Sequence, residues 1–178
     1  MRRVSVHIGA GQLMARSFKL TADGGSRGNP GPAGYGAVVT EGGKIVAELF
    51  DVIGVATNNV AEYNGLLAGL IHIHQLDPQA TVEVAMDSKL VVEQMSGRWQ
   101  IKHADMRDLA KQCRAAHEPS LVTYSWIPRD ENSHADRLAN KALDGGSDHK
   151  PISVIQQNYL TDRLRSAEIP TFIYFIRH

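Results

Sequence analysis

Cysteine is nearly absent from this sequence, because Cys113 is the single cysteine among 178 residues. An internal disulfide is therefore excluded. A chain without disulfides suits a reducing compartment, so we expect it in the cytoplasm. Long apolar runs are also lacking: none approaches the about 20 residues that a membrane-spanning helix needs, so we expect no membrane partner.

Net charge is the third thing that the sequence lacks. Its 19 lysine and arginine residues balance 19 aspartate and glutamate residues, so the chain as a whole does not attract a polyanion. A nucleic-acid partner would need a local basic patch. The sequence makes no prediction of the oligomeric state.

The chain divides into three parts. Residues 15–145 have the composition and length of one globular domain, and residues 1–14 form an N-terminal extension. Residues 146–178 begin with a linker-like composition and end in the apolar run 171–176. That run predicts either the first strand of a missing domain or an apolar tail that pairs with a sheet edge or a second copy.

Short strands open the domain. Residues 18–22 alternate apolar and polar side chains, which predicts a half-buried strand, and 33–40 and 44–55 follow as an antiparallel meander. Strands over 81–86 and 121–127 then alternate with helices, which are expected over 57–76, 87–95, 104–117 and 132–143. This order predicts an α/β fold with a mixed five-stranded sheet, three antiparallel strands then two parallel ones, flanked by helices.

A glycine-rich stretch, Asp23-Gly-Gly-Ser-Arg-Gly-Asn-Pro-Gly31, follows the first strand. Asp23 ends that strand on its polar face, and the glycines let the backbone turn sharply or approach another backbone closely. An Asp-Gly pair is also ordinary hairpin chemistry. This stretch alone therefore leaves an active-site loop and a plain turn both open.

Three further acids stand at helix starts or strand ends, and each has a purely structural explanation. Glu62 lies three residues after Asn59, and Asp136 lies three residues after Ser133, which is the spacing of a capping box. Asp87 follows the fourth strand and has the place of an N-cap for the next helix. Taken singly, these acids favour structural roles.

Taken together, the four acids favour a catalytic site. The order of elements makes the first and fourth strands neighbours, so their acids meet at one edge of the sheet, and the two helix starts can reach the same edge. Four carboxylates brought close repel one another unless cations intervene, and Mg²⁺ prefers carboxylate oxygens. Two such ions about 3.5–4 Å apart activate a water and stabilise the leaving oxygen of a phosphodiester.

Four segments that carry these acids resemble the motifs of type 1 ribonuclease H, in the same order. They are Asp23-Gly-Gly-Ser-Arg-Gly-Asn-Pro-Gly-Pro, Thr57-Asn-Asn-Val-Ala-Glu62, Met86-Asp87-Ser88 and His134-Ala-Asp136-Arg-Leu-Ala, and the resemblance covers residues 18–144. It implies a ribonuclease H-like fold and an endoribonuclease that hydrolyses the RNA strand of RNA–DNA hybrids with two Mg²⁺ ions, with Mn²⁺ as the alternative metal. Asp23, Glu62, Asp87 and Asp136 would be the catalytic residues and the metal ligands.

The same resemblance implies the substrate contacts. Residues of the glycine loop and of the first helix start would read 2′-hydroxyl groups, which distinguish RNA from DNA. Thr57 and Asn59 would hold a phosphate of the DNA strand. The expected contact residues are Gly24, Ser26, Gly28, Asn29, Thr57, Asn58, Asn59, Lys89, Trp99, Lys102 and Arg129.

The sequence departs from many bacterial members at three places, and in these places it resembles a short-loop, archaeal-like branch of the family. Segment 96–105 is too short for a basic handle helix, so Trp99 and Lys102 would contact the DNA strand instead. Arg129 stands in the short loop where those members carry a mobile histidine, and because arginine stays protonated its help would be electrostatic. Lys89 stands where some relatives carry a glutamine that touches the RNA strand.

The chain also resembles the N-terminal domain of actinobacterial proteins that join ribonuclease H to a histidine phosphatase, because Arg177-His178 resembles the opening of the phosphatase motif. Two rival functions stay open. One is a nucleic-acid-binding module with little catalysis that positions a missing partner domain, and the other is a nuclease of the same fold that cuts duplex RNA. His134 is expected to be a surface histidine rather than a catalytic one.

Overall fold

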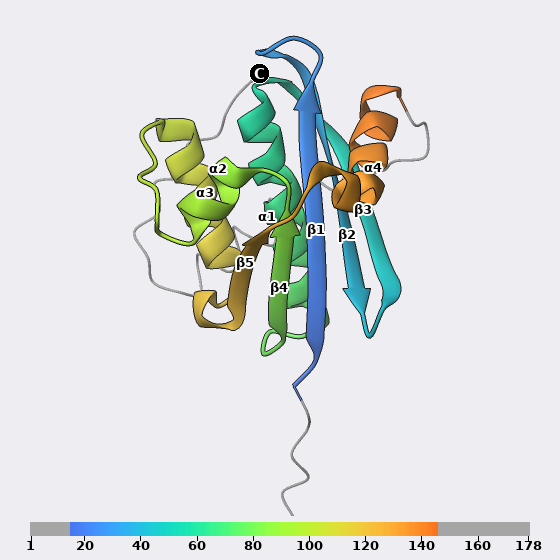
Figure 1. The fold of residues 1–178 in the computed structure, drawn as a ribbon, viewed down its shortest axis with the longest axis vertical. Coiled ribbons are helices and arrows are strands. Elements are labelled where there is room, and N and C mark those ends of the chain that lie inside the picture. The colour runs from blue at the N-terminus through green and yellow to red at the C-terminus, as the bar shows by residue number, and fades with distance from the viewer. Residues whose placement is uncertain (1–14, 146–178) are drawn as a thin grey trace, which may run out of the picture.

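A five-stranded sheet lies at the centre of the structure, a computed structural model that describes residues 15–145. The strands are β1 (Ser17–Ser26), β2 (Gly31–Glu41), β3 (Lys44–Ala56), β4 (Thr81–Met86) and β5 (Val122–Trp126). Their order is β3-β2-β1-β4-β5, with β1, β2 and β3 antiparallel and with β4 and β5 parallel to β1 (Figure 1). The predicted mixed sheet is confirmed. The extension predicted over 1–14 and the linker and strand predicted over 146–178 lie outside the described residues.

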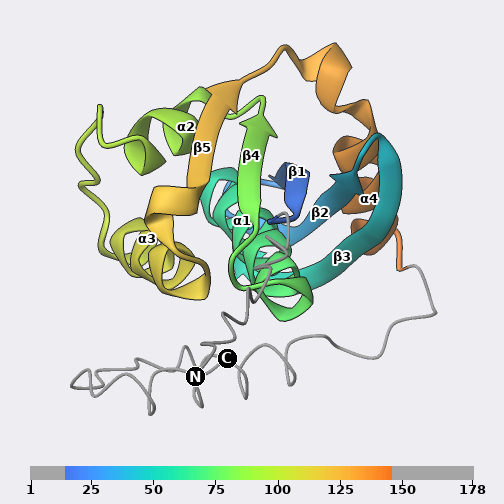
Figure 2. The ribbon, with the colours of Figure 1, turned by 90° about the horizontal axis from the view of Figure 1, so that it is seen from below.

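Helices cover both faces of this sheet. Within the described part of the chain they are α1 (Asn58–Leu76), α2 (Lys89–Met95), α3 (Ala104–Ala116) and α4 (Ser133–Leu143), with short 3₁₀ helices η1 (Pro119–Leu121) and η2 (Arg129–Asn132). Helices α1 and α3 lie on one face, and α4 covers β2 and β3 on the other (Figure 2). The order of strands and α-helices is the predicted one, and only the two 3₁₀ helices were not foreseen. None of the helices in residues 15–145 has the length and apolar character needed to cross a bilayer.

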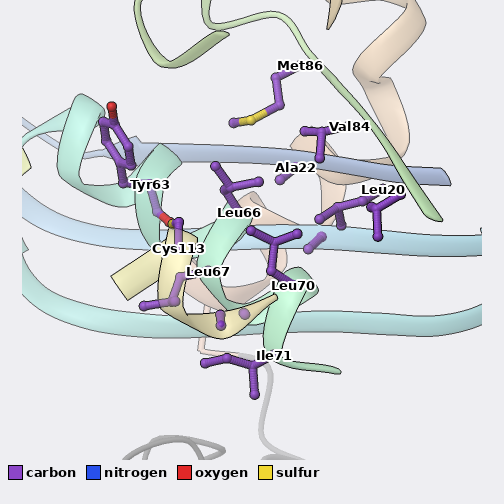
Figure 3. Close-up of a cluster of buried hydrophobic side chains, with 14 of the residues drawn as sticks. Leu20, Ala22, Tyr63, Leu66, Leu67, Leu70, Ile71, Val84, Met86 and Cys113 are labelled. Atoms are coloured by element: carbon purple, nitrogen blue, oxygen red, sulfur yellow. The ribbon is translucent and has the colours of Figure 1, made fainter. Parts of the chain in front are cut away.

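The main core forms where α1 packs along β1. Tyr63, Leu66 and Leu70 recur at helical spacing, as the sequence predicts, and are fully buried together with Leu20 (Figure 3). A Cβ on Gly69 would lie 2.3 Å from the Leu20 side chain, so this glycine lets the helix lie close against the strand. The tight contact fixes the beginning of α1 beside the far end of β1, where the candidate site lies.

Candidate active site

Asp23 does not end β1, contrary to the prediction. The strand continues to Ser26 in antiparallel pairing with β2, whereas its parallel pairing with β4 stops at Thr21. Asp23 therefore lies just beyond the point where β1 loses its β4 neighbour, which leaves room on that side. The residue is 9% exposed, and its Oδ1 accepts a hydrogen bond of 2.9 Å from the Gly24 N–H.

Gly24 brings β1 into backbone contact with α1. A Cβ at this position would lie 2.2 Å from the carbonyl carbon of Ala61 and 2.3 Å from the backbone nitrogen of Glu62. Any side chain would push the strand and the helix apart. The glycine after Asp23 therefore sets how closely the first two acids approach.

Glu62 does not belong to a capping box, so that structural explanation is wrong. Thr57 is the N-cap of α1, and its Oγ1 accepts a hydrogen bond of 3.3 Å from the Val60 N–H. Glu62 consequently lies beyond the first turn. Its Oε2 accepts a hydrogen bond of 2.5 Å from the Ser88 hydroxyl, which joins α1 to the beginning of α2.

Asp87 is not an N-cap, because Ser88 takes that place. The Ser88 Oγ accepts a hydrogen bond of 3.4 Å from the Val91 N–H while its proton goes to Glu62. The Asp87 carboxylate lies at the sheet edge, where its Oδ1 accepts a hydrogen bond of 2.7 Å from the Asn132 side chain. Ser88 thus caps α2 and orients Glu62.

Asp136 lies in the first turn of α4, as predicted, but its capping-box explanation is also wrong. Asn132 rather than Ser133 is the N-cap residue, and its side chain makes no capping bond. The Asp136 Oδ1 lies 3.8 Å from the Arg129 guanidinium, whose side chain is 83% exposed. Arg129 is therefore beside the acidic edge and open to solvent.

Asn132 is a site residue that the sequence reasoning missed. Its amide Nδ2 donates to the Ala22 carbonyl at 2.9 Å and to the Asp87 Oδ1 at 2.7 Å, so it joins the strands that carry the first and third acids. The residue is 2% exposed, and its Oδ1 has no hydrogen-bond partner among the described residues. Nothing near Asn132 in the sequence marks it, because both partners lie far away along the chain.

The pKa values show that the four acids share one edge. Burial, together with the charges of the Asp87, Asp136 and Glu62 carboxylates, raises the pKa of Asp23 to about 7, against the effect of the Gly24 hydrogen bond. Burial also raises the pKa of Glu62 to about 7, with Asp87 adding to the effect and the Ser88 hydrogen bond opposing it. Such perturbed acids in one place are typical of functional sites.

The donor chemistry of this edge fits a hard divalent cation, because all four side chains offer carboxylate oxygens. Across residues 15–145, no three His, Cys, Asp or Glu side chains converge tightly enough to form a ready-made metal-binding group. A cation would relieve the repulsion that raises the pKa of Asp23. The carboxylate oxygens are therefore the ligand type that Mg²⁺ prefers, but the described side chains are not already arranged as a complete set of metal ligands.

The predicted contacts for the RNA strand gather where the glycine loop meets α1. The Ser26 N–H and hydroxyl donate to the Asn58 Oδ1 at 2.8 and 2.9 Å, and the Asn58 N–H donates to the Asn29 Oδ1 at 3.1 Å. Gly28 has a φ of +96°, a conformation that favours glycine. These bonds hold the loop against the helix start, with Thr57 and Asn59 beside it.

Three other predicted contacts lie in α2 or in the segment that follows it. Lys89 is the exposed first residue of α2, and Trp99 and Lys102 are exposed between α2 and α3. Gln94 of α2 joins that segment to the core, because its Nε2 donates to the Gln100 carbonyl at 3.5 Å and its Oε1 accepts from the Tyr63 hydroxyl at 2.8 Å. His134 lies 2.5 Å from Glu48 on β3, so its imidazole is engaged on the surface.

An α/β unit with this strand order and with four carboxylates at one edge of its sheet has the ribonuclease H-like fold. The family model described as "Reverse transcriptase-like" matches residues 21–142. The chain belongs to this family of ribonuclease H-like proteins.

Several relatives are similar over the whole described domain. "Bifunctional protein Rv2228c" of Mycobacterium tuberculosis is 46% identical over 169 residues, which cover 89% of this chain and 46% of that protein. The chain thus spans about half the length of the first curated relatives it matches. The solved N-terminal RNase H domain of Rv2228c is 52% identical, with a TM-score of 0.69 over 74% of this chain and 96% of that chain.

Two further solved structures are similar. RNase H1 of the halophilic archaeon Halobacterium salinarum is 40% identical, with a TM-score of 0.68 over 72% of this chain and 98% of that chain. LC11-RNase H1, solved in complex with an RNA/DNA hybrid, is 35% identical, with a TM-score of 0.67 over 72% of this chain and 98% of that chain. The resemblance to an archaeal enzyme and to the N-terminal domain of a larger protein is confirmed.

Proposed function

We propose that this domain is an endoribonuclease that hydrolyses the RNA strand of RNA–DNA hybrids by a two-metal-ion mechanism. One observation carries the proposal: the buried Asp23 on β1 lies near enough to the acids of α1, the end of β4 and α4 for all three to raise its pKa. A module that only binds nucleic acid has no use for a group of carboxylates that repel phosphate. Family membership and a relative solved with an RNA/DNA hybrid support the same activity.

Asp23, Glu62, Asp87 and Asp136 would hold two Mg²⁺ ions, with Mn²⁺ as the alternative. Such ions would activate water as Lewis acids and stabilise the leaving 3′-oxygen, and the products would then carry 5′-phosphate and 3′-hydroxyl ends. The chain's own part is to hold the acids in place. The Ser88 hydroxyl orients Glu62, and the Asn132 amide orients Asp87.

The remaining side chains would recognise the substrate. Ser26, Asn29 and Asn58 form a hydrogen-bonded polar surface at the glycine loop, which suits 2′-hydroxyl groups of an RNA strand. Arg129 would offset negative charge beside Asp136 and attract phosphate. Because the net charge of the chain is zero, local cations such as Arg129 would have to supply the attraction for the nucleic acid.

The test is cleavage of end-labelled RNA–DNA hybrid, duplex RNA and duplex DNA in Mg²⁺, with a chelator control. Wild type is compared with Asp87→Asn and with Asp108→Asn, which removes an exposed acid of α3 outside the site. We expect hybrid-selective cutting that disappears with Asp87→Asn and with chelator and persists with Asp108→Asn. Binding without metal-dependent cutting supports the binding-module rival, and preferential cutting of duplex RNA supports the other nuclease.

A further inference from the structure

Trp126 is an exposed aromatic residue at the acidic edge. Neither the proposed metal ligands nor the predicted substrate contacts include it. It is the last residue of β5 and pairs with Met86, so it lies beside the residue that precedes Asp87. Its side chain is 53% exposed, although burying an indole is normally favourable. The sequence contains only one other tryptophan, Trp99.

The Trp126 indole is held in one orientation. Its Nε1–H donates to the Asp87 carbonyl oxygen at 3.1 Å, and the N–H of the next residue, Ile127, donates to the Met86 carbonyl at 2.9 Å. Because the one polar atom of the ring is already bonded inside the protein, the indole offers a ligand only its apolar surface. A fixed aromatic surface loses little freedom when a ligand covers it.

Two exposed cations lie close to Asp87 and Trp126 along the chain. Lys89 follows Asp87 by two residues and is exposed, and Arg129 follows Trp126 by three residues and is 83% exposed beside Asp136. A fixed aromatic surface bonded to Asp87, on a sheet edge that also carries an exposed arginine, suits a nucleic-acid strand, because its sugars and bases offer apolar surface and its phosphates are charged. A protein partner would not need two cations next to a cluster of carboxylates.

We propose that Trp126 is a substrate-binding residue, which contacts the sugar and base edge of the RNA strand beside the cleaved phosphodiester. This inference rests on the proposed hybrid-cleaving function and adds a contact to it. The contact is apolar, so it contributes affinity without distinguishing RNA from DNA and without the salt dependence of a phosphate contact.

The kinetic test compares Trp126→Ala and Trp126→Phe with wild type on the hybrid. We expect Trp126→Ala to raise KM by about 5- to 150-fold, the range that loss of a base-stacking aromatic gives, with kcat nearly unchanged. Trp126→Phe keeps an aromatic ring but loses the bond to Asp87, and we expect it to retain most of the affinity. Ile45→Ala is the matched control, because Ile45 is equally exposed, at 53%, and lies near the β2–β3 turn away from the acids.

Fluorescence gives a second readout that a structural role would not move. In Trp99→Phe, Trp126 is the only tryptophan, and we expect its emission to change on titration with hybrid when Asp23→Asn is added to prevent cutting. An unchanged KM in folded Trp126→Ala, or unchanged emission on binding, overturns the inference. A loss of kcat with unchanged KM in both Trp126 variants also overturns it, because it assigns the residue to holding Asp87. If wild type neither binds nor cuts hybrid, the proposed function fails as well.

Discussion

Asp23→Asn should make the metal-free protein more stable, although it should abolish cleavage. In the folded protein, burial and three neighbouring acids raise the pKa of Asp23 to about 7 from its ordinary value of 3.8. The asparagine keeps an oxygen that accepts the Gly24 N–H and carries no charge. The substitution therefore removes repulsion without removing that hydrogen bond.

The size of the effect follows from the difference in pKa between the folded and unfolded states. Each pKa unit corresponds to about 1.4 kcal/mol, so keeping Asp23 ionised in the fold at pH 8 costs about 4 kcal/mol. The new amide needs partners at a buried place, which offsets part of the gain. We expect a net stabilisation of about 2–4 kcal/mol, and a domain of this size gains about 3 °C in Tm for each kcal/mol.

The pH dependence has a definite sign. A carboxyl whose pKa is raised by folding binds more protons in the folded state between its two pKa values, so wild-type stability falls as pH rises from about 4 to about 7. Glu62 contributes in the same direction in both proteins. The advantage of Asp23→Asn should thus be absent at pH 4, grow through this window and level off above pH 7.

The assay is thermal unfolding followed by circular dichroism in chelator from pH 4 to pH 9, with Asp108→Asn as the control acid. Repeating the melts in saturating Mg²⁺ should shrink or reverse the difference, because a bound ion stabilises wild type. An Asp23→Asn protein that is less stable than wild type above pH 7 in chelator would refute the electrostatic account.

Three further predictions follow from the contacts. Gly24→Ala should destabilise the fold by at least about 2 kcal/mol and abolish cleavage, because its Cβ would lie 2.2 Å from the Ala61 backbone. The control is Gly25→Ala, whose Cβ would have nothing within 4 Å, and it should be nearly neutral in melting and activity assays. Asn132→Ala should lower kcat about 10- to 100-fold with KM unchanged in steady-state assays, and an unchanged kcat would show that its amide does not position Asp87. Arg129→Ala should reduce the slope of log affinity against log salt by about one phosphate contact, and an unchanged slope would remove Arg129 from the substrate interface.

The order of strands and helices was readable from the sequence, and the four acids that the sequence singled out lie near one another in the fold. Alternation predicts the strand around Leu20, and helical spacing predicts the buried face of Leu66 and Leu70, because these patterns depend on neighbours only a few residues away. The spacing of Glu62 from Asn59 is equally local, yet it indicated a capping box that does not form. Thr57 caps the helix instead, which left Glu62 free to bond Ser88.

What only the tertiary structure decided is which distant groups meet. Asn132 reaches the Ala22 carbonyl across 110 positions of the chain and Asp87 across 45, and Trp126 donates to the Asp87 carbonyl across 39. No periodicity marks such residues, because their roles arise where separate strands end side by side at one sheet edge. The sequence by itself therefore determined the elements and the acids, while packing between distant segments decided how those acids are held and which aromatic surface lies next to them.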